Sequence, residues 1–155
     1  MQTEYVKVIA SDDVLNEQAF VAYWTEARLG WHDLIVSKMT IIDEQSQVLG
    51  TRPQAKILNL PVFRDIHLVR NDINAASVMI RASLLERALL STNARNAEDW
   101  PIWRMAVFEN WKVMTVQYPL VLYRQNSKGL SAGFSNNRNQ EYLSRLEGEM
   151  KNLFK

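Results

Sequence analysis

The chain has 155 residues, which is enough for one domain with a substantial core. Hydrophobic residues make up 47% and charged residues 23%, a composition that excludes an intrinsically disordered chain. Eighteen basic residues against 17 acidic ones give a net charge of +1, which offers no electrostatic reason to expect nucleic acid as a partner. The absence of cysteine excludes a disulfide scaffold, a thiolate nucleophile and a Cys-ligated zinc site. Because no signal peptide and no run of about 18 apolar residues is present, we predict a soluble, cytoplasmic single domain without a transmembrane segment.

The first third of the chain predicts a strand, a helix and a hairpin. Residues 5–10 alternate and are rich in β-formers, so they predict a short strand. Residues 16–29 predict a helix that stops at Gly30, and residues 33–43 predict a strand that returns as a hairpin at residues 48–49. The apolar residues at helical spacing in the predicted helix are Phe20, Val21, Trp24 and Ala27.

The middle of the chain is less regular. Two prolines interrupt residues 50–75, which predict a loop with functional mobility. A strand is expected over residues 75–81 and a short helix over residues 82–89. Asp99 is well placed as an N-cap, and it predicts a helix over residues 100–110.

The last third predicts two strands, a loop and a terminal helix. The strands cover residues 112–116 and 120–123, and a Gly/Ser/Asn-rich loop follows over residues 124–136. In the tail, residues 135–155, an amphipathic helix begins at residue 137. Its apolar face consists of Tyr142, Leu143, Leu146, Met150 and Leu153.

Two acidic doublets are the candidate functional residues. Asp12 and Asp13 follow the first predicted strand, and the carboxyl ends of strands are where ligands sit in open α/β sheets. Two carboxylates there can ligate Mg²⁺ or Mn²⁺, which in turn neutralises a diphosphate. The spacing equally allows a simpler role, in which one of the two aspartates caps the helix that follows.

The second doublet, Glu98 and Asp99, opens a predicted helix. A carboxylate at that position is stabilised by the helix dipole, so a cap is one interpretation. A general base that takes the proton of a substrate hydroxyl is the other. Arg124, which follows the last predicted strand, is either a phosphate clamp or an ordinary surface arginine.

The order of these segments resembles the C-terminal part of family 2 glycosyltransferases, inverting enzymes of the GT-A fold. The resemblance spans about residues 4–132. It rests on EYVKVIASDDVL at residues 4–15, NAASVMIR at residues 74–81, and AEDWPIWRMA at residues 97–106 followed by WKV and PLVLYR. It implies an α/β fold with a partial GT-A-like mixed sheet flanked by helices, in which residues 1–134 are family-like and residues 135–155 form the C-terminal helix.

The resemblance also implies a donor side. Asp13 would ligate the Mg²⁺ or Mn²⁺ that bridges the diphosphate of a nucleotide-sugar, and Asp12 would lie beside it, near the nucleoside. Arg124 and Ser131 would lie near the diphosphate leaving group.

On the acceptor side, the resemblance implies that Asp99 deprotonates an acceptor hydroxyl for in-line attack at the anomeric carbon. Glu98 and Trp100 would line that side. The acceptor would be a glycan or a lipid-linked molecule, which is compatible with peripheral contact at the inner face of the membrane.

The chain departs from the family pattern in two respects. Ala10 stands two residues before Asp12, so only the Asp pair of the fuller acidic motif is present. The chain also begins just before that motif, and the family's N-terminal nucleotide-binding β-α units are expected to be missing from it. The alternative function is therefore a non-catalytic glycosyltransferase remnant that serves as an interaction module, in the form of a homodimer that covers an exposed sheet edge.

Overall fold

The computed structural model describes residues 4–52, 73–90 and 99–127. The chain divides into two compact units, Met1–Arg124 and Gln125–Lys155, and every helix and strand given below belongs to the first. The helix predicted for the tail lies outside the described residues. None of the helices that the structure describes has the length and apolar character needed to cross a bilayer.

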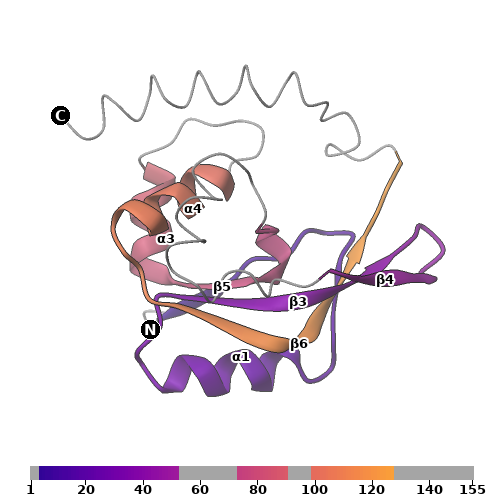
Figure 1. Cartoon of the computed structure of the whole chain (residues 1–155), viewed down its shortest axis with the longest axis horizontal. Helices are drawn as coiled ribbons and strands as arrows, with labels where there is room; N and C mark the ends of the chain where they lie inside the picture. The colour runs from indigo at the N-terminus through magenta and orange to yellow at the C-terminus, as the bar shows by residue number, and fades with distance from the viewer. Residues whose placement is uncertain (1–3, 53–72, 91–98, 128–155) are drawn as a thin grey trace. The chain divides into compact units, whose positions relative to one another are not determined.

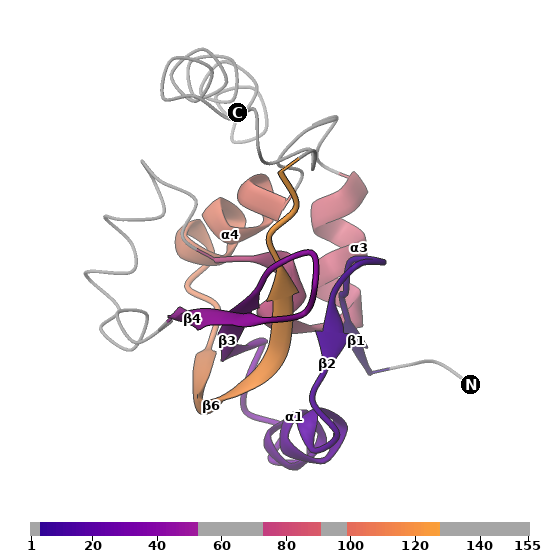
Figure 2. The same cartoon turned by 90° about the vertical axis from the view of Figure 1, so that its right-hand side faces the viewer.

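A six-stranded mixed sheet forms the centre of the first unit (Figure 1). The sheet order is β1-β5-β3-β6-β2, and β4 pairs with β3 outside this path. The long strands β3 and β6 run parallel to each other, whereas all other pairs are antiparallel. Figure 2 shows the curl of the sheet. The strands are β1 (Tyr5–Lys7), β2 (Val14–Leu15), β3 (Leu34–Ile42), β4 (Val48–Arg52), β5 (Val78–Arg81) and β6 (Val113–Arg124).

Helices cover both faces of this sheet (Figure 1). Helix α1 (Ala19–Arg28) packs against one face, and α3 (Ala82–Leu90) and α4 (Asp99–Phe108) pack against the other. Successive side chains of a strand point to opposite faces. Leu34 and Val36 of β3 accordingly enter the core with α3 and α4, while Ile35 between them enters the core with α1. The prediction of a mixed α/β sheet flanked by helices is confirmed, and the GT-A likeness stays a prediction.

Three local predictions differ from the structure. The first strand ends at Lys7, and a turn closed by Asp13 N–H and the Ala10 carbonyl (3.3 Å) leads into the unpredicted β2. Residues 75–77, expected as strand, form a 3₁₀ turn, η2 (Ala75–Ser77), because the Asn74 side chain accepts a hydrogen bond from Ala76 N–H at 2.8 Å.

The two strands expected around Pro119 form the single strand β6. Val116 pairs with Ser37, Pro119 with Lys38 and Val121 with Met39, so residues 117–118 and residue 120 bulge out of the ladder on either side of Pro119. A bulge is one of the few places where a strand tolerates proline, which has no N–H to donate.

Helix α1 lies where the sequence predicts it, but its large apolar residues do not face the sheet. The small residues Ala19 and Ala27 are buried together with Tyr23, whose hydroxyl donates to the Ser77 carbonyl at 2.8 Å. Phe20, Val21 and Trp24, by contrast, are exposed. Burial raises the pKa of the Tyr23 hydroxyl, which keeps it protonated as a donor.

Candidate functional site

Asp13 and Arg124 meet where the turn before β2 lies beside the end of β6. Asp13 Oδ1 accepts a hydrogen bond from the backbone N–H of Arg124 at 2.9 Å, across 111 positions of sequence. Val14, the residue after Asp13, pairs with Leu122 of β6, and this pairing holds Asp13 close to Arg124. The structure therefore brings together two residues that the sequence assigned to one donor site.

The guanidinium of Arg124 extends this contact to two other segments. Its Nε donates to the Asp12 carbonyl at 3.0 Å, and Nη1 donates to the Asp43 carbonyl at 2.8 Å and to Ser46 Oγ at 3.0 Å. A guanidinium suits this position because its donors lie in one rigid plane. Arg124 thus joins the acidic turn to the β3–β4 hairpin and keeps a positive charge beside both aspartates.

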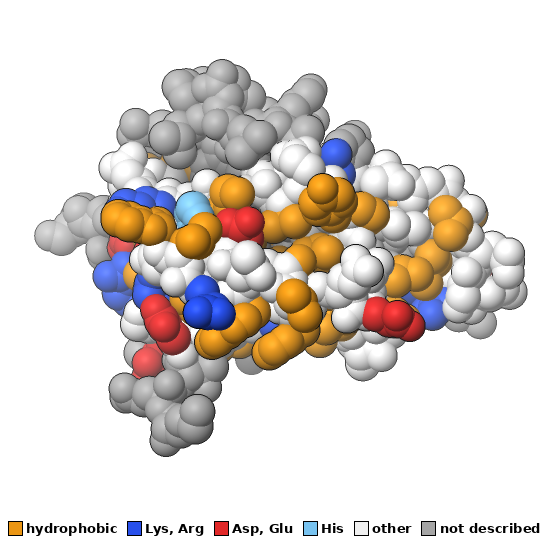
Figure 3. All heavy atoms as spheres, turned by 90° about the horizontal axis from the view of Figure 1, so that it is seen from below, with side chains coloured by type: hydrophobic (Ala, Val, Ile, Leu, Met, Phe, Trp, Pro, Cys, Tyr) orange, Lys and Arg blue, Asp and Glu red, His pale blue; other side chains and the backbone are white. Residues whose placement is uncertain are grey.

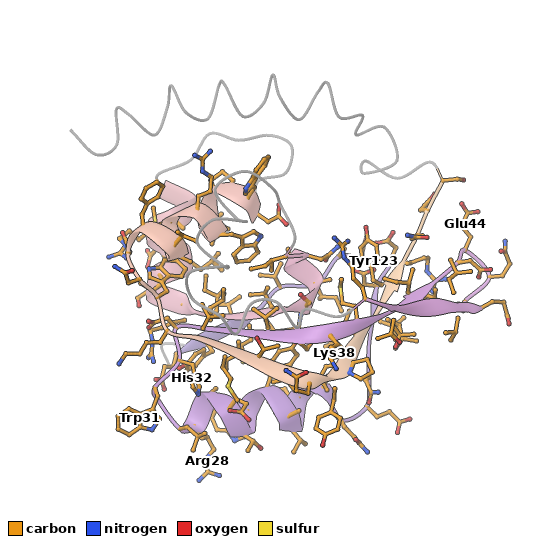
Figure 4. All side chains as sticks on the ribbon, in the orientation of Figure 1. Arg28, Trp31, His32, Lys38, Glu44 and Tyr123 are labelled. Carbon is orange, nitrogen blue, oxygen red and sulfur yellow. The ribbon has the colours of Figure 1, made fainter. Side chains whose placement is uncertain are left out.

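The β3–β4 hairpin turn is itself ordered by Asp43. One oxygen of its carboxylate, Oδ1, accepts from the N–H groups of Gln45 at 2.9 Å and Gln47 at 2.8 Å. Ser46 adopts a left-handed backbone with φ of 65°, which is uncommon for serine and is held by this turn. Figure 4 shows Glu44 in this turn and Tyr123 on the neighbouring strand. Arg124 therefore donates to a turn that Asp43 holds in place, through the Asp43 carbonyl, the Glu44 carbonyl at 3.3 Å and Ser46 Oγ.

The second oxygen of Asp13 is not satisfied. Oδ2 is buried and has no hydrogen-bond partner among the residues that the structure describes. Burial raises the pKa of the Asp13 carboxyl and the charge of Asp12 raises it further, whereas the Arg124 N–H, Lys7 and the Arg124 guanidinium oppose the rise without cancelling it. A half-buried carboxylate with an unpartnered oxygen is a position where a cation would be stabilised.

Lys7 is the charged residue of this region that sequence reasoning missed. Its ammonium donates to the carbonyls of Val8 and Ala76 and lies 5.3 Å from the centre of the Tyr23 ring. Burial lowers the pKa of Lys7 to about 8, and the charge of Asp13 opposes this shift. A lysine between two valines gave no signal in the sequence, because an alternating strand normally turns such a residue to solvent. We define the acidic corner as Asp12, Asp13, Arg124 and Lys7.

The acidic corner fits a divalent cation as part of a larger ligand set. Among residues 4–52, 73–90 and 99–127, no three His, Cys, Asp or Glu side chains lie close enough together to hold a metal ion by themselves. Mg²⁺ is commonly held by one or two carboxylates, while substrate phosphates and water complete its shell. Asp13 through Oδ2, with the exposed Asp12, supplies the carboxylates of such a set.

The acceptor-side residues lie on a different element. Asp99 is the first residue of α4 and is half-buried, in the first turn where a carboxylate is favoured by the helix dipole. It takes part in none of the Arg124 contacts above. Trp100 is 3% exposed, which leaves little of its ring open to an acceptor. Glu98 and Ser131 lie outside the described residues.

Neither a protein-family model nor a curated protein matches this chain. The resemblance to family 2 glycosyltransferases therefore stays a prediction from the sequence. The functional argument rests on the residues of the acidic corner and their geometry.

Proposed function

We infer that this chain belongs to a metal-dependent, inverting glycosyltransferase that moves a sugar from a nucleotide-sugar donor to an acceptor hydroxyl. The acidic corner is the diphosphate side of the site, and Asp99 is the acceptor base. One observation carries the inference: Asp13 is held by Arg124 through one oxygen while its other oxygen is buried without a described partner.

The roles of the charged residues in the acidic corner follow from the negative charge of the leaving group. A departing nucleoside diphosphate carries negative charge that must be neutralised. Asp12 and Asp13 would hold Mg²⁺ or Mn²⁺, which would supply this neutralisation. Arg124 fixes the two aspartates relative to the β3–β4 hairpin.

The acceptor needs only position and a base. Asp99 would accept the proton of the attacking hydroxyl, which then attacks the anomeric carbon from the face opposite the diphosphate and inverts the configuration. Its place in the first turn of α4 anchors it on a rigid element, because Trp103 of the same helix is 1% exposed and donates from Nε1 to the Ile73 carbonyl at 3.1 Å.

Calorimetric titration of the chain with UDP, in the presence and absence of Mn²⁺, tests this proposal. We expect heat of binding that requires Mn²⁺ and is lost in Asp13→Asn, which keeps the size of the side chain but removes its charge. Asp99→Asn is the matched control, since it should leave UDP binding unchanged and abolish transfer. The proposal is wrong if neither this chain nor a homologue that carries the N-terminal β-α units gives heat, or if Asp13→Asn binds UDP and Mn²⁺ as the wild type does.

A further inference from the structure

The outward side of α1 is an apolar surface that none of the described residues covers. We call it the α1 face and define it as Phe20, Val21, Trp24, Thr25 and Arg28, which share one side of the helix at i, i+1, i+4, i+5 and i+8. The exposed fractions are 70% for Phe20, 63% for Val21 and 51% for Trp24. Two exposed aromatic side chains one helical turn apart form a patch, not the single scattered apolar residues that are normal on protein surfaces.

Neighbouring residues extend this patch beyond the end of the helix. Leu29 is 54% exposed and Trp31 is 68% exposed. Figure 3 shows apolar side chains across this side of the molecule, with acidic and basic side chains among them, and Figure 4 shows Arg28 and Trp31 pointing away from the sheet. An aromatic side chain buries about 150–250 Å² when it is covered. The exposed apolar surface of this region, which comes from Phe20, Val21, Trp24, Leu29 and Trp31, is therefore roughly 500 Å². With their polar neighbours they approach the roughly 800 Å² that each partner contributes to a stable interface.

The charges at the two ends of the α1 face are opposite. Glu17 is exposed just before the first turn, and Arg28 is exposed at the last residue of the helix. If a second copy of α1 packs antiparallel so that Val21 faces Trp24 of that copy, the same register places Glu17 opposite Arg28. Two-fold symmetry then repeats both contacts, so one register satisfies the apolar centre and both charged ends.

We propose that the α1 face is a two-fold interface between two copies of this chain, with α1 packed antiparallel against α1 of the second copy. In this register the face is complementary to itself in charge, and its apolar residues meet at the centre. An anionic membrane surface is a poorer occupant, because the negative charge of Glu17 at one end of the α1 face offsets the positive charge of Arg28 at the other. Trp and Phe at the centre with a charged rim match the usual anatomy of protein interfaces.

Sedimentation equilibrium of the full chain and its variants tests the proposal. We expect a dimer for the wild type and a monomer for Trp24→Glu, which places two like charges at the centre of the interface. Leu89→Glu is the matched control, since Leu89 is equally exposed, at 51%, but belongs to α3 on the other side of the sheet. This control should remain a dimer.

A charge exchange tests the register. Glu17→Arg and Arg28→Glu should each raise the dissociation constant of the dimer roughly tenfold, because each replaces two attractive contacts by two repulsive ones. The double variant restores opposite charges and should restore the dimer. A monomeric wild type, a dimeric Trp24→Glu, or a double variant no tighter than the single ones would overturn the proposal, and so would wild-type monomers that bind anionic vesicles through Trp24.

Discussion

The carboxylate of Asp13 accepts the backbone N–H of Arg124 at 2.9 Å, and this contact joins the turn after β1 to the end of β6. The same carboxylate has a buried oxygen with no partner among the described residues. One oxygen of this group therefore serves the fold, while the other is the atom to which the proposal assigns a metal ion. This division can be tested separately for stability and for binding.

Asp13→Ala should destabilise the fold by about 1–3 kcal/mol, because it leaves the N–H of Arg124 without its acceptor. Asp13→Asn keeps an acceptor oxygen for that N–H and removes a charge whose burial is unfavourable, so its stability should equal or exceed that of the wild type at pH 7. Urea denaturation monitored by circular dichroism measures both. Asp12→Ala, whose side chain is exposed, is the control and should change stability by less than about 0.5 kcal/mol. Equal losses in Asp13→Ala and Asp13→Asn would show that the charge, not the hydrogen bond, is what the fold requires.

Arg124→Lys should also be destabilising although the charge is kept. A lysine ammonium cannot reproduce the planar set of donors that contacts the Asp12 carbonyl, the Asp43 carbonyl and Ser46 Oγ. We expect a loss of about 1–3 kcal/mol in the free energy of unfolding. Arg28→Lys is the matched control because its side chain is exposed at the end of α1. If the two substitutions cost the same, the Arg124 contacts contribute nothing beyond charge.

Lys7 should make stability depend on pH above neutrality. Its pKa is about 8 in the folded chain, against 10.5 for an ordinary lysine, so between these values the unfolded chain binds a proton that the folded chain has released. The penalty for burying the charge is complete below pH 8 and is relieved as the pH rises toward 10.5. The free energy of unfolding should therefore rise more steeply between pH 8 and 10 in the wild type than in Lys7→Met.

Urea denaturation at half-unit pH steps gives the two slopes for Lys7. Lys112→Met, which changes an exposed lysine, should keep the slope of the wild type. Identical slopes for wild type and Lys7→Met would mean that Lys7 stays charged in the folded chain.

The buried Trp103 and the exposed Trp31 allow the same substitution to be compared in the core and on the surface. Trp103→Phe removes the donor to the Ile73 carbonyl and opens a cavity at a residue that is 1% exposed, so we expect a cost of about 2–4 kcal/mol. Trp31→Phe changes a residue that is 68% exposed and should cost less than about 0.5 kcal/mol. Thermal denaturation compares the stability of the two variants. A loss of stability in Trp103→Phe as small as that in Trp31→Phe would argue against the packing of α4 on the sheet.

Hydrophobic periodicity was sufficient for most elements of the fold. It located α1, β3, α3 and α4 within a few residues, because each has a clear apolar period or a strong cap. It failed where tertiary pairing decides the outcome. The two-residue strand β2 exists only through its pairing with β6, and β6 runs through Pro119 only because the strand bulges on both sides of this residue. Periodicity also could not say which side of α1 is buried, since alanines and Tyr23 fill the space beside the sheet.

For the site, the resemblance assigned Asp12, Asp13 and Arg124 to one donor side, and in the structure Arg124 contacts both aspartates. The roles of these residues stay predictions. The sequence could not predict that the Arg124 guanidinium donates to the β3–β4 hairpin or that Lys7 is half-buried and interacts with the charge of Asp13, because both depend on the curl of the sheet. The roles of Asp99, Glu98, Trp100 and Ser131 also stay predictions.

The most direct test of the central claim is to locate Mn²⁺ on the folded chain by paramagnetic broadening of backbone amide NMR signals in the presence of UDP. We expect the amides of Asp13, Val14 and Arg124 to broaden first, and we expect Asp13→Asn to abolish the effect while its spectrum stays folded. Broadening that begins elsewhere, or that persists unchanged in Asp13→Asn, would contradict the assignment of the acidic corner as the metal and diphosphate site.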